Sequence, residues 1–141
     1  MIYITSEDLK TKIKDNVIND TTENDNTLID SIELCALSEV KAYITHYYDL
    51  DLEFTLTGTQ RNYFLVKIIV DIMLYEISSR LTPNNIPQIR KDRYDAAVVW
   101  LTQVSQGKLT PNVPQRDPAV ELSSEKGGLK GGSYTKINSQ F

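Results

Sequence analysis

The side chains best suited to chemistry in this sequence are those of His46, Cys35 and Asp71. His46 is the one histidine, and a catalytic histidine needs an orienting acid and a nucleophile, which its neighbours do not supply. We expect it to have a surface or capping role. Cys35 falls on the apolar stripe of a predicted helix, which favours a small buried hydrophobic residue over a nucleophile.

Asp71 is the most informative acid, because it lies within the most apolar predicted helix. A buried carboxylate needs a partner, and Lys67 or an arginine such as Arg93 could supply it. We expect a structural ion pair here, with a catalytic role for Asp71 as the weaker alternative. The sequence has no glycine-rich phosphate loop and no HExxH motif, and residues 15–20 lack the glycine and glutamate of a calcium loop. These patterns predict no enzyme activity, no cofactor and no metal site.

The composition is that of a folded globular domain, with 141 residues, 40% of them hydrophobic and 24% charged. A formal net charge of −4 argues against non-specific binding to nucleic acid or to an anionic membrane. The first residues lack the pattern of a signal peptide. The longest apolar stretch, residues 63–77, is interrupted by charges and is too short to span a bilayer. We expect a soluble intracellular protein with no membrane partner.

Apolar residues at helical spacing predict an all-α fold, a compact bundle of about four helices. A hydroxyl cap followed by acidic residues starts the first helix at Thr5, and Pro87 fits the first turn of the last helix. The third helix is apolar around nearly its whole circumference and should be buried on several sides. The predicted helices cover residues 5–14, 28–47, 59–80 and 87–106.

Two segments between these helices do not fit the helical pattern. Residues 15–26 are rich in Asp, Asn and Thr and are predicted to form a loop. Over residues 48–59 apolar and polar residues alternate, which predicts an extended arm between two helices. Such an arm must pack on the helices or pair with another chain. Its apolar residues are Leu50, Leu52, Phe54 and Leu56.

The composition changes after Leu109, because three prolines within residues 110–118 exclude a helix and residues 123–133 are rich in glycine and serine. We predict a helical domain over residues 1–110 and a long non-helical C-terminal arm over residues 111–141. Apolar residues recur along the arm, as in segments that become ordered on a partner; a disordered end without a role is the alternative. The apolar residues considered for an interface are Val120, Leu122, Leu129, Tyr134, Ile137 and Phe141.

Charged residues are unevenly distributed along the chain. Residues 15–39 contain many acidic side chains but no lysine or arginine, and a basic cluster follows later. Acidic and basic faces could meet between copies of the chain; a solvated acidic loop and a basic helix start are the alternative. Contact of the basic cluster with phosphates is less favoured, because Asp92 and Asp95 are interleaved with it. The cluster consists of Arg80, Arg90, Lys91 and Arg93.

Five short patterns follow one another along the chain: residues 3–9 (Y-x-T-x-x-D-L), 48–50 (Y-D-L), 71–75 (D-I-x-x-Y), 93–101 (R-Y-x-x-A-x-x-x-L) and 107–109 (G-K-L). In this order they resemble the patterns of a known family, the small α-helical proteins from Mu-like tailed bacteriophages and prophages, which are grouped with head–tail connector (adaptor) proteins. The resemblance covers about residues 1–110, and the chain departs from the family pattern at Asp51, where a proline is usual.

The resemblance implies a structural virion protein that docks as a ring on the portal protein and joins capsid to tail. It implies as partners the portal, further copies of the chain in a ring for which the family suggests twelve-fold symmetry, and other tail or connector proteins, with incidental contact to packaged DNA. The expected location is the head–tail junction of the virion, after assembly in the host cytoplasm. A nucleic-acid-binding or packaging accessory protein of a phage or prophage is the alternative. Within the helical domain the candidate interface residues are Leu52, Phe54, Leu56, Arg80, Arg90 and Lys91.

Overall fold

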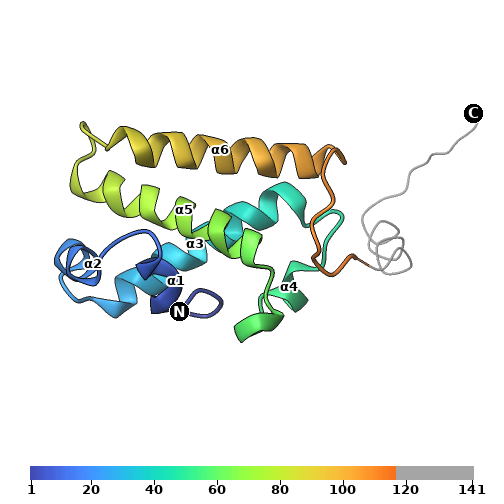
Figure 1. The fold of residues 1–141 in the computed structure, drawn as a ribbon, viewed down its shortest axis with the longest axis horizontal. Helices are drawn as coiled ribbons and strands as arrows, with labels where there is room; N and C mark the ends of the chain where they lie inside the picture. The colour runs from blue at the N-terminus through green and yellow to red at the C-terminus, as the bar shows by residue number, and fades with distance from the viewer. Residues whose placement is uncertain (117–141) are drawn as a thin grey trace, which may run out of the picture.

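The computed structural model describes residues 1–116, which are helical and contain no strand (Figure 1). The predicted all-α fold is therefore confirmed for this part of the chain. The four predicted helices are all present, and two further short α-helices lie between them. The elements are α1 (Ser6–Lys10), α2 (Asp15–Thr22), α3 (Asn26–Ile44), α4 (Leu50–Glu53), the 3₁₀ helix η1 (Gly58–Gln60), α5 (Tyr63–Leu81) and α6 (Gln88–Ser105).

Helix α5 is the centre of the fold, because most of its side chains are buried, as its apolar sequence predicts. Helices α3 and α6 both pack against it (Figure 1). Tyr75 of α5 stacks on Tyr94 of α6 with ring centroids 4.3 Å apart, and the Tyr94 hydroxyl donates to Glu39 of α3 at 2.7 Å. The three long helices therefore contact one another. The most enclosed side chains of α5 include those of Leu65, Ile69, Ile72, Met73 and Leu74.

A buried carboxylate holds the N-terminal segment against this core. Glu33 of α3 is completely buried and accepts hydrogen bonds from the backbone N–H groups of Ile2, Tyr3 and Ile4, at 2.6–2.8 Å. Burying an ionised group is costly unless hydrogen bonds replace those it made with water, and these three bonds do so. Glu33 thereby docks residues 1–4 on α3.

A second polar network joins the N-terminal segment to α4 and α5. The Tyr3 hydroxyl donates to Glu53 at 2.5 Å, and the same carboxylate oxygen accepts from the backbone N–H of Asn62, the N-cap of α5. Arg61 donates to both carboxylate oxygens of Asp8 and to the carbonyl oxygen of Tyr3. Burial opposes ionisation of Asp8, but its hydrogen bonds outweigh this effect and lower the pKa of the carboxyl group.

The extended arm predicted over residues 48–59 is wrong, because this segment forms α4 and η1. Asp49 caps α4 by accepting a hydrogen bond from the N–H of Leu52. Leu50 and Phe54 are four residues apart and are both buried, as expected for neighbours on one face of a helix. A helix of one turn is too short to display its own period, so the alternation of apolar and polar residues did not reveal it.

The loop predicted over residues 15–26 is also wrong in its first part, which forms α2. The hydroxyls of Thr21 and Thr22 donate to backbone carbonyls four residues earlier, so both polar side chains can be buried beside Ile18. The helix ends at Glu23 and Asn24, which both have positive φ and redirect the chain toward α3. The polar composition of this segment wrongly predicted a loop, because the threonine hydroxyls find hydrogen-bond partners within the helix.

Residues 111–116, predicted to begin the C-terminal arm, lie against the link between α3 and α4 (Figure 1). The N–H of Asp49 donates to the carbonyl of Pro114 at 2.8 Å, and the N–H of Arg116 donates to the carbonyl of Tyr47 at 3.0 Å. Val113, the valine of this segment, is buried. These six residues therefore pack on the helical body.

Replacing Glu33 with alanine should lower the free energy of unfolding by about 3 kcal/mol, because three backbone N–H groups lose their acceptor. Urea denaturation followed by circular dichroism measures this change. Glu7→Ala is the matched control, since the Glu7 side chain is 81% exposed, and it should cost less than about 0.5 kcal/mol. Equal destabilisation by the two substitutions would contradict the role assigned to Glu33.

Two truncated chains test where the folded body ends. A chain that ends at residue 116 should unfold in one cooperative transition. A chain that ends at residue 110 should be about 2–3 kcal/mol less stable, because it lacks the buried valine and two backbone hydrogen bonds. Identical urea midpoints for the two chains would instead support a domain boundary between residues 110 and 111.

Candidate interaction surfaces

The predicted interface residues of segment 48–59 separate into buried and exposed ones. Phe54 is only 7% exposed and its ring centroid lies 5.0 Å from that of Tyr3, so it belongs to the core. Leu56 is half-buried, whereas Leu52 on α4 is 50% exposed. Of the three predicted residues, Leu52 offers the most apolar surface to a partner.

A hollow of about 260 Å³ lies between α3 and α4 and is termed the α3–α4 groove. Leu37 and Phe54 form its floor, since both are nearly buried, and the exposed side chains of Ile2 and Leu34 lie at its edges. Exposed apolar surface of this kind commonly marks a site of interaction with another segment or protein. The groove is lined by Ile2, Leu34, Leu37, Ser38, Lys41, Asp51, Phe54 and Thr55.

Sequence reasoning missed this groove because it placed Cys35 on the buried face of α3 and did not place Leu37 there. Cys35, predicted to be buried, is exposed, whereas Leu37 and Glu33 are buried. Apolar spacing alone does not distinguish these positions, since Leu34 is as apolar as Leu37. The docking of residues 1–4 on Glu33 turns that side of the helix inward.

Two of the three basic candidates bond to backbone carbonyls in or just before the acidic segment, residues 15–39. Arg80 donates to the carbonyl oxygen of Thr21 at 3.1 Å, and Arg90 donates to that of Lys12 at 3.2 Å. Lys91 is exposed. The turn between α5 and α6 therefore lies at the same end of the molecule as α2 (Figure 1). This arrangement does not support separate acidic and basic faces that meet between copies of the chain.

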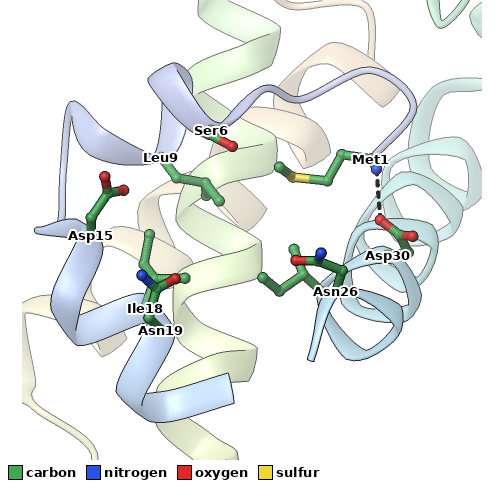
Figure 2. A pocket seen from close by; sticks show the side chains of 9 residues that line it. Met1, Ser6, Leu9, Asp15, Ile18, Asn19, Asn26 and Asp30 are labelled. Atoms are coloured by element: carbon green, nitrogen blue, oxygen red, sulfur yellow. Dashed lines mark hydrogen bonds and ion pairs between the residues drawn. The ribbon is translucent and has the colours of Figure 1, made fainter. Parts of the chain in front are cut away.

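A second hollow, of about 410 Å³, opens between α1, α2 and the start of α3 (Figure 2). Asp15 and Asp30 are its acidic residues, and the amino group of Met1 binds Asp30 at 2.6 Å. This bond raises the pKa of the amino group. Within residues 1–116 no three His, Cys, Asp or Glu side chains are grouped so that they could hold a metal ion. The other lining residues are Ser6, Leu9, Ile18, Asn19, Asn26 and Ile29.

Asp71 is buried, as predicted, and binds a lysine that sequence reasoning did not consider. Its Oδ1 lies 2.5 Å from Nζ of Lys12, and its Oδ2 lies 3.7 Å from Nζ of Lys67, one of the predicted partners. Burial lowers the pKa of Lys12, and Asp71 only partly opposes this effect. No sequence signal links Lys12 to Asp71, because 59 residues separate them.

An aromatic patch is formed by Tyr63 and Phe64, at the start of α5, and by Trp100 of α6. The ring centroids of Phe64 and Trp100 are 5.1 Å apart, and Tyr63 and Phe64 are both about half exposed. Arg61 lies over Tyr63 and Lys67 over Phe64. Aromatic side chains are enriched at protein interfaces. The patch could not be predicted from the sequence, because α5 is apolar along its length and the sequence does not show that its first turn is exposed.

Residues 3–128, which are most of the chain, match a protein-family model described as Bacteriophage Mu, Gp36. The chain belongs to this family. No curated protein and no solved structure matches it. The predicted resemblance to the small helical proteins of Mu-like phages is thus confirmed, and family membership indicates a bacteriophage structural protein.

The match to the Gp36 family continues beyond residue 110, where the sequence patterns ended, to residue 128. Within residues 1–116 no helix is both long and apolar enough to cross a membrane. The interface residues predicted in the C-terminal arm all lie outside the described residues: Val120, Leu122, Leu129, Tyr134, Ile137 and Phe141.

Asp71→Asn in this Gp36 family protein should lower the free energy of unfolding by about 3 kcal/mol, because the largely buried Lys12 loses its main counter-charge. The double variant Lys12→Met/Asp71→Leu should recover most of the loss, since it removes both charges. Lys67→Ala is the control and should cost less than about 1 kcal/mol. Chemical denaturation measures all three, and an unchanged stability of Asp71→Asn would contradict a structural ion pair.

Proposed function

We propose that the chain is a head-to-tail connector (adaptor) protein of a bacteriophage virion. In this role it docks as a ring on the portal protein and joins the capsid to the tail at the head–tail junction. The observation that carries the proposal is the family match over residues 3–128, together with the connector-like sequence patterns in the same region. The proposal includes no enzyme activity and no cofactor, because Asp71 is paired with Lys12 and the sequence has no catalytic motif around His46 or Cys35.

The exposed apolar surfaces support a role in assembly. A subunit of a closed ring uses two different surfaces to contact its two neighbours. The α3–α4 groove with nearby Leu52 is one candidate surface, and the aromatic patch on α5 and α6 is another. The proposed partners are the portal, further copies of the chain in a twelve-fold ring, and other tail or connector proteins. Contact with packaged DNA would be incidental.

Because each surface is small, we expect the subunits to assemble into a ring on the portal, which acts as a template. Contacts of this size are weak individually, but subunits held side by side on a portal bind one another at high effective concentration. A subunit can therefore remain separate in the host cytoplasm and join a ring only where the portal presents several adjacent sites. This behaviour would restrict ring formation to assembled portals.

A nucleic-acid-binding or packaging accessory role is the alternative, and the surroundings of Arg90 count against it. Arg90 has a guanidinium nitrogen, Nη1, that is buried and lacks a hydrogen-bond partner within residues 1–116. Burial, reinforced by the charge of Arg93, lowers the pKa of this group. The other guanidinium nitrogen is bound to the carbonyl of Lys12, which leaves the side chain poorly placed to contact phosphates. Binding of DNA that falls steeply with salt and is abolished by Lys91→Glu would favour this alternative.

The copy number in purified virions tests the connector role. Quantitative mass spectrometry should find about one copy of the chain per portal subunit, as expected for two rings of matching symmetry. Leu52→Asp should reduce incorporation at least about tenfold, because it places a charge in a proposed interface. Ile89→Asp is the matched control, since Ile89 is equally exposed and lies at the start of α6. It should leave incorporation unchanged.

Two results would contradict the proposal. Absence of the chain from mature particles, despite its presence in infected cells, would shift the assignment to an accessory role. Equal incorporation of the Leu52→Asp and wild-type chains would exclude the surface around α4 from the assembled interface.

A further inference from the structure

One face of α3 connects the α3–α4 groove to the point at which the described chain ends. Leu34, Ser38, Lys41 and Thr45 are spaced by four, three and four residues, so they form one continuous row along the helix. The first three line the groove. Thr45 lies at the C-cap of the same helix and accepts hydrogen bonds from Arg116, at its carbonyl oxygen (2.8 Å) and its hydroxyl (2.9 Å).

The direction of the chain leads toward the same face. The carbonyl of Pro114 binds the N–H of Asp49, and two residues later the N–H of Arg116 binds the carbonyl of Tyr47. The chain therefore runs from Asp49 toward Thr45 as it reaches residue 116. The pKa of Asp51, at the edge of the groove, is lowered chiefly by its hydrogen bond from Lys41, and the charge of Arg116 adds to this effect. Arg116 is bonded to Thr45, one helical turn from Lys41, and so lies at the end of the groove.

The length and pattern of the next residues fit the groove. Along α3, Ser38 and Leu34 lie about 10 and 16 Å from Thr45, at 1.5 Å per residue. An extended chain advances about 3.3 Å per residue, so Val120 and Leu122 can reach about 13 and 20 Å beyond Arg116. Residues two apart point to the same side of an extended chain, with Glu121 on the other side. Asp117 precedes Pro118, and this pair favours extended backbone.

We propose that the α3–α4 groove is the docking site of the chain's own residues 117–122, with Val120 and Leu122 packed over Leu37 and Phe54. The segment itself lies outside the described residues, and the family match includes it. Docking covers the apolar floor of the groove in the free subunit. This inference does not require the connector function.

Thiol accessibility in the full-length chain tests the docking. In a Cys35→Ser/Ser38→Cys background the introduced thiol lines the groove and is the only one in the chain. Adding Val120→Asp/Leu122→Asp should make it react with iodoacetamide about tenfold faster, because the covering segment leaves the groove. Ile137→Asp/Phe141→Asp is the matched control and should react as slowly as the background chain. Circular dichroism verifies that every variant is folded.

Each outcome decides the proposal. Faster labelling of the Val120→Asp/Leu122→Asp chain alone, at a rate independent of protein concentration, supports docking within one chain. Equal labelling rates in all three chains overturn it. Protection that increases with protein concentration also overturns it, because the groove would then hold the segment of a second copy. A virion count near one copy per portal subunit would be compatible with any of these results, so failure of this proposal and failure of the connector role are distinguishable.

Discussion

A helix that is apolar around most of its circumference has to be covered on most of its sides, and this requirement organises the molecule. Helix α5 is enclosed by α3 and α6 and, on its remaining sides, by the short helices α1 and α2. Its one buried acid, Asp71, is neutralised by Lys12 from the link between those short helices. Burial of the apolar side chains of α5 and pairing of the Asp71 charge thus both stabilise the packing of the N-terminal region on this helix.

Short elements cannot bury enough apolar surface to hold themselves in place, so polar bonds anchor them here. Glu33 binds three backbone N–H groups of the N-terminal segment, Glu53 joins Tyr3 to the start of α5, and Arg61 joins α1 to the same point. These bonds also decide the rotation of α3. Because the Glu33 side of the helix faces inward, Leu34 is left at the surface and contributes to a groove. The interaction surface is thus a consequence of how the N-terminal segment is anchored.

The long helices and the central position of α5 could be predicted from the sequence, because helical periodicity persists over many turns. The short helices could not, since one or two turns do not establish a period, and the threonines of α2 find their partners only within the folded helix. Of the candidate interface residues in this region, Leu52 is half exposed, whereas Phe54 is in the core. The partner of Asp71 and the burial of Glu33 depend on contacts between residues far apart in the sequence, which spacing does not reveal.

Helix α3 contacts both ends of the described chain, and this connects folding with assembly. Glu33, in its second turn, holds the N-terminal segment, and Thr45, at its C-cap, holds Arg116. The groove lies along the same helix between these two attachments. Ile2 lines the groove, and its N–H is bound by Glu33, so displacement of the N-terminal segment would remove one edge of the groove. Any ligand that binds the groove with Ile2 in place must therefore stabilise the N-terminal attachment, because thermodynamic coupling between two sites is reciprocal.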